Sequence, residues 1–233
     1  LQKYAAQNHS NEKEQMKAYL TKYNDKLGAA LCKYVKPKHQ WGRVHPEKSI
    51  GLTSLGLKVR NTLIRDLYYD LDLKNAQVEI VRNICQKNDI ECQMVADYCT
   101  RRDERLKEIS EEYKVTRKCA KKLILRLCFF GTFEGWVVEQ GLSGVTVSPW
   151  VAQFINELNE IAHKLREKNH ILYESARKSK EVKNKAKNAI GSFFALYLQE
   201  WELRIVEKIM NWLFSNTDVM NHPGGRTDYN VGV

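Results

Sequence analysis

The sequence predicts an α+β fold that is predominantly helical and carries a small antiparallel sheet. From position 75 onward, most apolar residues recur at steps of three and four, as they do on one face of a helix. Before that point, residues 63–73 alternate between apolar and acidic side chains as in a strand, and residues 41–57 combine Gly and Pro with short apolar groups as in a hairpin. A chain of 233 residues that is 43% hydrophobic can bury a core, which excludes a disordered or collagen-like protein.

The N-terminal part is expected to begin with one helix. Apolar residues stand at helical spacing over residues 10–35, and Pro37 ends the pattern. The glycines and Pro46 within residues 41–57 then indicate a loop or hairpin that lies against another element.

Three helices are expected after the predicted strand. The first opens after Asn75, where the apolar spacing becomes helical. Asp89 can cap a second helix that runs through residues 97–106, and Thr116 can cap a third that ends near Phe130.

The remaining chain is expected to hold a connection and two long helices. Residues 136–149 are rich in Val and Gly and end at a proline, so they predict a connection or short hairpin. Helical spacing covers residues 150–173 and again residues 190–213, where large apolar side chains share one face for six turns. The last segment is therefore expected to be a core helix.

The charge of the chain favours an anionic partner. Lys and Arg number 38 against 28 Asp and Glu, which gives a formal net charge of +10. The strongest local bias lies in residues 164–187, with nine Lys or Arg against three Glu, although such a run is also typical of a solvated helix face. No apolar run is long enough to span a bilayer, and we expect an intracellular protein without distinguishing nucleus, cytoplasm or viral replication site.

The cysteines and the chain ends suggest a reduced fragment of a larger protein. No C-x-x-C pair occurs, so we expect core thiols and no zinc or thioredoxin motif. The first residue is Leu, and residues 229–233 look like the start of a strand.

Two carboxylates at the end of the predicted strand suggest a metal site. Asp70 and Asp72 fall on one face of residues 63–73, and a helix follows directly. Carboxylate oxygens suit Mg²⁺, which leaves other coordination positions to water and phosphates. The alternative is that an Asp at this place only caps the next helix.

A basic stretch opens the helix that begins at Thr116. Arg117 and Lys121 share one helical face, and further cations surround them at Lys118, Lys122 and Arg126. Clustered cations repel one another unless an anion such as a triphosphate lies among them. A solvated basic helix is the alternative.

The order of several short motifs resembles the polymerase domain of family A DNA polymerases. The motifs are Trp41-Gly42-Arg43-Val44, Leu57-Lys58-Val59-Arg60, Asp72-Leu73-Lys74-Asn75-Ala76-Gln77, and Arg117-x-x-Ala120-Lys121 with Phe130-Gly131 beyond. The chain is most similar to the divergent branch carried by transposons, virophages and large DNA viruses, in which a helicase is often fused. The resemblance spans roughly residues 41–214.

This resemblance implies four parts and a nucleotidyltransferase. Residues 1–40 would be an N-terminal helical segment, 41–115 a palm-like part with the first catalytic motif, 116–187 helical fingers, and 188–233 a palm core helix that leads into the second catalytic hairpin. The second catalytic carboxylate would then lie beyond Val233. A DNA primer–template, a deoxynucleoside triphosphate and a fused or associated helicase or primase are the implied partners.

The resemblance also assigns roles to individual residues. Asp72 would be the catalytic metal ligand, with Asp70 as the alternative in register, and two Mg²⁺ ions, replaceable by Mn²⁺, would be the cofactor. The incoming nucleotide would be bound by Arg117, Lys121, Lys122, Gln77 and Phe130, with Phe129 as an alternative to Phe130. The nucleic-acid backbone would be contacted by Arg43, Arg60, Lys183 and Lys187.

Two further hypotheses remain open from the residues alone. One is that the chain is a basic helical nucleic-acid-binding module without chemistry, which would use residues 164–187 as a phosphate track. A helical scaffold that docks an acidic protein surface is the other.

Overall fold

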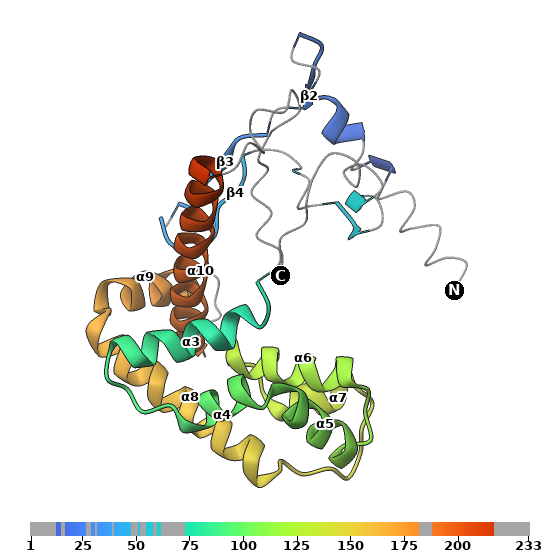
Figure 1. Ribbon diagram of the computed structural model, residues 1–233, viewed down its shortest axis with the longest axis vertical. Coiled ribbons are helices and arrows are strands. Elements are labelled where there is room, and N and C mark those ends of the chain that lie inside the picture. Colours follow the sequence, from blue (N-terminus) through green and yellow to red (C-terminus); the bar gives the residue numbers. More distant parts are fainter. Residues whose placement is uncertain are drawn as a thin grey trace. The chain divides into compact units, whose positions relative to one another are not determined.

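The protein divides into two compact units, which we describe separately. The computed structural model describes residues 13–14, 17–26, 29–30, 32–38, 40–47, 51, 55–57, 60–61, 73–181 and 188–216. Residues 1–73 and 203–233 form one unit, and residues 74–202 form the other. The structure confirms the predicted class, since helices predominate and the strands pair antiparallel (Figure 1).

The first unit contains two short β-hairpins. Strand β1 (Tyr23–Asn24) pairs with β2 (Ala29–Ala30), and β3 (Tyr34–Val35) pairs with β4 (His45–Pro46), both antiparallel. Only β4 of the second hairpin falls within residues 41–57, where a loop or hairpin was predicted, since its partner β3 lies in the range predicted to be helical. The second hairpin is reinforced by Glu47, whose N–H donates to the Lys33 carbonyl at 2.7 Å and whose carboxylate lies 3.1 Å from the Lys33 ammonium.

The single helix predicted over residues 10–35 is wrong. Helical turns occur at residues 13–14 and 17–20, after which the chain turns and enters β1. Asn24 and Asp25 favour turns because their side chains compete for backbone hydrogen bonds. The chain therefore forms a hairpin in which Tyr23 pairs with Ala30, in place of the helix that the apolar spacing predicted. The strand predicted at residues 63–73 lies outside the described residues except for Leu73.

The second unit is a bundle of helices. In chain order these are α3 (Ala76–Lys87), α4 (Gln93–Thr100), α5 (Arg102–Glu112), α6 (Arg117–Cys128), α7 (Phe133–Glu139), α8 (Pro149–Lys168), α9 (His170–Glu181) and α10 (Ala189–Asn216), of which α10 continues past residue 202. Helix α4 packs on α3, α5 and α8, while α6 packs on α3, α5 and α7 (Figure 1).

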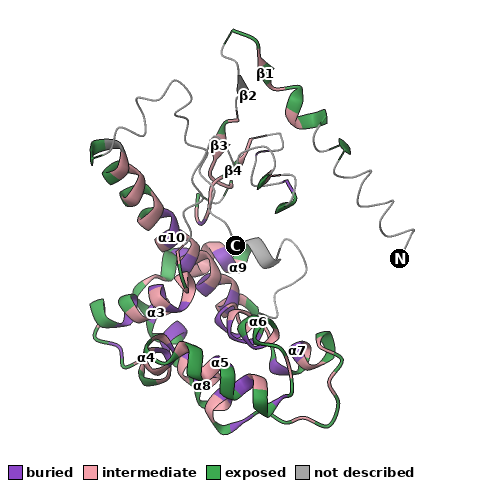
Figure 2. Ribbon diagram, turned by 45° about the vertical axis from the view of Figure 1, so that its right-hand side comes forward, coloured by how far each residue is buried: buried purple, intermediate pink, exposed green. Residues whose placement is uncertain are grey.

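The core of this unit is aromatic and aliphatic. Buried residues lie where the helices face one another (Figure 2). Each large side chain taken fully out of water contributes about 1.5–3 kcal/mol before entropy costs. Trp136 is fully buried and its indole N–H donates to the Cys119 carbonyl at 3.1 Å, so its polar atom is satisfied. Other fully buried side chains are Val81, Val95, Leu106, Leu123, Phe154, Ile161 and Phe193.

Local capping explains where three helices begin. The Thr116 hydroxyl accepts from the Cys119 N–H at 3.3 Å, as predicted, and Ser148 caps α8 with Pro149 in its first turn. Thr132 caps α7 by accepting from the Gly135 N–H at 3.0 Å. The prediction that residues 136–149 are only a connection is therefore wrong in its first part, because this cap and the burial of Trp136 make residues 133–139 helical.

Helix α4 is capped from a distant part of the chain. Both carboxylate oxygens of Glu157 in α8 accept backbone N–H groups, from Met94 at 2.9 Å and from Val95 at 2.8 Å. Asp89, the predicted cap, instead occupies a left-handed turn with φ 54°. The prediction that Asp89 caps this helix is wrong. The backbone N–H groups at the start of α4 are bound instead by Glu157, which lies 63 residues beyond Met94 in the sequence.

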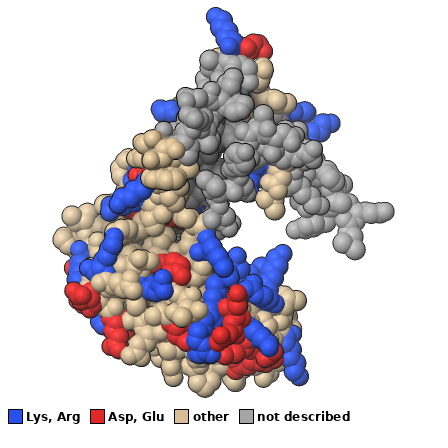
Figure 3. Space-filling view, in the orientation of Figure 1, with Lys and Arg blue, Asp and Glu red and all other residues tan. Residues whose placement is uncertain are grey.

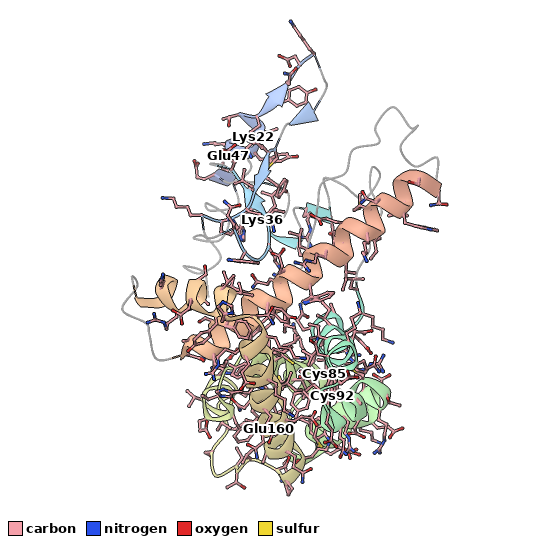
Figure 4. The ribbon with its side chains drawn as sticks, turned by 90° about the vertical axis from the view of Figure 1, so that its left-hand side faces the viewer. Lys22, Lys36, Glu47, Cys85, Cys92 and Glu160 are labelled. Carbon is pink, nitrogen blue, oxygen red and sulfur yellow. The ribbon has the colours of Figure 1, made fainter. Side chains whose placement is uncertain are left out.

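We predict that Glu157→Ala destabilises the helical unit by about 1–3 kcal/mol, because two backbone donors lose a charged acceptor. Glu160→Ala is the matched control, since Glu160 is exposed on the same helix (Figure 4). Urea denaturation measures both. Equal stability of the two variants would contradict the capping role.

Asp97 joins α4, α5 and α8. Its Oδ2 accepts from Arg105 Nε at 2.6 Å and from Trp150 Nε1 at 3.0 Å, and the Arg105 guanidinium lies 5.2 Å from the Trp150 ring centroid. The hydrogen bond from Arg105, aided by the one from Trp150, lowers the pKa of Asp97 below its ordinary value. The ionised carboxylate is thus part of the folded structure.

We predict that Asp97 makes part of the stability acid-sensitive. Because its pKa is lowered in the folded protein, its contribution is fully present above the unfolded value near 3.8 and is lost as the pH falls through the folded value. At pH 7, Asp97→Asn should cost about 1.5–3 kcal/mol, and the gap to wild type should shrink below pH 4. Denaturation at several pH values measures this, with the exposed Asp89→Asn as control. A gap that is constant with pH would show that ionisation of Asp97 is irrelevant.

Candidate nucleic-acid interface

The outer face of α6 gathers cations. Its inner face is buried through Ala120, Leu123, Ile124 and Leu127, which turns the polar positions outward. Lys and Arg gather over α6, with Asp and Glu beside them over α5 (Figure 3). The outward cations are Arg117, Lys118, Lys121, Lys122 and Arg126.

Three of these cations are paired with acids. Arg117 forms an ion pair with Asp103 of α5. Arg126 Nη1 lies 2.8 Å from Glu139 Oε2 of α7, and Lys122 Nζ lies 3.8 Å from the other oxygen of the same carboxylate. Acidic side chains of the protein therefore balance three of the five cations without an added anion such as a triphosphate.

Lys118 and Lys121 remain as exposed cations. Within the described part of the chain, neither has an ion pair or a side-chain hydrogen bond. They stand three residues apart on one helix and are surface neighbours, so their charges repel unless an anion lies between them. We call these two residues the lysine pair of α6.

The other predicted nucleotide contacts are engaged within the protein. Gln77, in the first turn of α3, donates to Oε1 of the buried Glu202 at 3.5 Å. The Phe130 ring packs edge-to-face on Phe194 with centroids 5.3 Å apart. Along the helix, Phe130 lies about 13 Å beyond Lys121. The packing of Phe130 on Phe194 gives no support to the predicted stacking of Phe130 on a base, and that role stays a prediction.

The backbone at Phe130 and Gly131 ends helix α6. Phe130 has φ 58°, the left-handed conformation usually taken by glycine after a helix. Its N–H donates to the Leu127 carbonyl and that of Gly131 to the Arg126 carbonyl, which completes the end of α6. A Cβ on Gly191 would lie 2.6 Å from the Phe130 Cβ, so α10 approaches this turn closely only because residue 191 is glycine.

The remaining predicted site residues lie either outside the described residues or in the other unit. Lys183, Lys187 and the two predicted catalytic aspartates, Asp70 and Asp72, lie outside the described residues. Arg43 and Arg60 belong to the other unit, where the Arg60 N–H donates to the Gly56 carbonyl at 2.9 Å. Over the described ranges, no group of three or more His, Cys, Asp or Glu side chains is placed to hold a metal ion, and the Mg²⁺ prediction stays a prediction.

Of the six cysteines, Cys85 and Cys128 are buried and the other four are half-buried. All six cysteines are free, and Cys85 and Cys92 lie side by side with their thiols in hydrogen-bond contact (Figure 4). Burial raises the pKa of Cys99 and of Cys128 to about 12. A thiol held protonated in this way is a poor nucleophile, so these cysteines act in packing.

Sequence reasoning missed a polar pocket of about 430 Å³ at the start of α3 and the junction of α4 and α5. Its walls include Lys74, Asn75, Arg101 and Arg102. The pair of adjacent arginines at positions 101 and 102 was the available signal. The periodicity of the sequence does not show that the α4–α5 junction, which carries these arginines, packs against the start of α3.

Comparison with known proteins identifies a viral relative. The chain is 31% identical over 183 residues to "Putative helicase V13" of Sputnik virophage, an alignment that covers 76% of this chain and 23% of the relative. The chain thus spans about a quarter of the length of that relative. No family model matches the chain, and no solved structure matches it.

These comparisons contradict the polymerase prediction. The relative that aligns with most of the chain carries the name of a helicase, and no polymerase family is found. The assignments as a family A-like polymerase and as a nucleotidyltransferase are therefore corrected. They rested on four motifs of only a few residues each, and such short patterns match by chance. The alternative of a binding module without chemistry gains no support from the relative's name either.

Among the described helices, none has both the length and the apolar character needed to cross a bilayer.

Proposed function

We propose that the chain is part of a nucleic-acid-metabolising enzyme of the helicase class and that it contacts nucleic acid through the lysine pair of α6. The name of the virophage relative supports the class, and the net charge of +10 supports an anionic partner. The observation that carries the proposal is that Lys118 and Lys121 are exposed while the neighbouring Arg117, Lys122 and Arg126 are held by acids.

The chemistry of the lysine pair suits the phosphate backbone. An ammonium group is a compact charge that binds phosphate oxygens without reading the base, so the contact is independent of sequence. An enzyme that acts along a strand needs contacts of this kind. Helix α6 already packs on α5 and α7, so binding does not require the helix to be ordered first.

We assign nucleic-acid binding, rather than nucleotide hydrolysis, to these residues. None of the twelve glycines begins a G-x-x-x-x-G-K-[ST] motif, the loop with which many NTP-driven enzymes hold phosphates. The nearest pattern runs from Gly51 to Gly56 and continues with Leu57-Lys58, which places Leu where the motif requires Lys. The relative's name is also in keeping with the expected fused or associated helicase.

We predict that Lys118→Gln with Lys121→Gln weakens binding of a fluorescent single-stranded oligonucleotide roughly tenfold at 100 mM salt. Removing two phosphate contacts should also reduce the slope of log K against log salt by about 1.4, because each contact on a single strand contributes about 0.7. Fluorescence anisotropy over a salt series measures both quantities.

The control is Lys107→Gln on α5, since Lys107 is exposed but lies 3.8 Å from the Glu111 carboxylate. It should retain the wild-type salt slope. Circular dichroism checks that the helices persist in each variant. If the lysine pair variant kept the wild-type slope, or if Lys107→Gln changed it equally, the proposed interface would be wrong.

A further inference from the structure

The polar pocket of the helical unit has an unusual balance of charge. It lies where the N-terminal end of α3 meets the α4–α5 junction, and all of its walls belong to residues 74–104. Lys74 and Asn75 precede α3, Glu79 lies in its first turn, and Arg101, Arg102 and Asp103 come from the junction. Acids and bases therefore line one small space.

Each carboxylate of the pocket already has its own arginine. Glu79 Oε2 lies 2.7 Å from Arg82 Nη2, and Glu104 Oε2, also in the wall, lies 2.7 Å from Arg101 Nε. The third, Asp103, is paired with Arg117 of α6.

Of the other bases in the wall, Lys74 is unpaired within the described chain and Arg102 has only a long ion pair. Lys74 is exposed and has no ion pair in the described part of the chain. The Arg102 side chain is 13% exposed, and its Nη1 lies 3.6 Å from Asp103, the acid that Arg117 engages more closely. Bases and acids thus line the pocket in equal number, three of each, and Lys74 is the one of these bases that no acid of the described chain pairs.

Two hydrogen-bond donors of the pocket have no acceptor. Asn75 Nδ2 and Arg102 Nε are buried without a hydrogen-bond partner in the described structure. Asn75 occupies the N-cap position of α3 but adopts φ 60°, and its side chain makes no capping bond. Buried donors without acceptors are rare because they cost free energy, and an acceptor bound in the pocket would recover that energy.

We propose that this pocket binds a phosphate group, held by the Lys74 ammonium, the Arg102 guanidinium and the Asn75 amide. A phosphate has negative charge and several acceptor oxygens, which match the unpaired Lys74 ammonium and the two unsatisfied donors. Small rotations of the Asn75 and Arg102 side chains toward the ligand would satisfy both. Asp103 connects the pocket wall to α6 through Arg117, next to the lysine pair.

The phosphate has two possible sources, a strand of nucleic acid or a free nucleotide. The biological context of this site rests on the proposed function, but its test measures phosphate binding directly and does not depend on the lysine pair. Calorimetry with inorganic pyrophosphate measures the pocket directly, and ATP and a single-stranded oligonucleotide serve as competitors.

Asn75→Asp is the decisive variant, because it replaces the donor by a carboxylate of nearly the same shape that also tolerates the left-handed conformation. It should weaken pyrophosphate binding at least tenfold, and Lys74→Gln, at an exposed position, should weaken it severalfold. Lys107→Gln, at an exposed position of α5 outside the pocket, should bind pyrophosphate as wild type does.

Competition by the oligonucleotide identifies a backbone phosphate as the natural ligand, whereas ATP competing alone identifies a nucleotide; either outcome supports the phosphate site. Wild-type protein that fails to bind pyrophosphate at millimolar concentration would overturn the inference. So would an Asn75→Asp variant that binds as well as wild type.

Discussion

The pairing of charges between α5, α6 and α7 is the constraint on which the functional account depends. Asp103 and Glu139 hold Arg117, Lys122 and Arg126, so the basic helix is not a uniformly charged rod. Exposed ion pairs of this kind contribute little to stability. Their effect here is to select which cations remain available. Among the described residues, that selection leaves the lysine pair of α6 facing solvent and Lys74 unpaired in the wall of the pocket.

Long-range polar contacts position the elements that carry these cations. Glu157 of α8 completes the start of α4, and Asp97 joins α4 to Arg105 of α5 and Trp150 of α8. Helix α4 is short, and a helix of this length has little stability of its own in water. The α4–α5 junction, and with it the wall of the pocket, therefore depends on side chains supplied by α8.

Sequence reasoning succeeded where the signal is local and failed where it is not. The starts of α3, α6 and α8 and the long core helix follow from apolar spacing and, for α6, from the cap Thr116. The hairpin at Tyr23 and the remote cap Glu157 depend on partners chosen by tertiary structure, so periodicity could not predict them. For the site, the basic face of α6 was predictable, whereas its partition into paired and unpaired cations required the positions of Asp103 and Glu139. Short motif resemblance misled the functional assignment, because four brief patterns do not distinguish a polymerase from a virophage helicase relative.

Lysine acetylation measured with and without a single-stranded oligonucleotide tests the central claim most directly. Mass spectrometry reports the reactivity of every exposed lysine in one experiment, and free lysines lose reactivity where phosphates cover them. The account predicts protection of Lys118 and Lys121, with Lys164 and Lys178 on α8 and α9 unchanged. Protection confined to Lys164 and Lys178 would contradict it and move the interface to the other basic stretch.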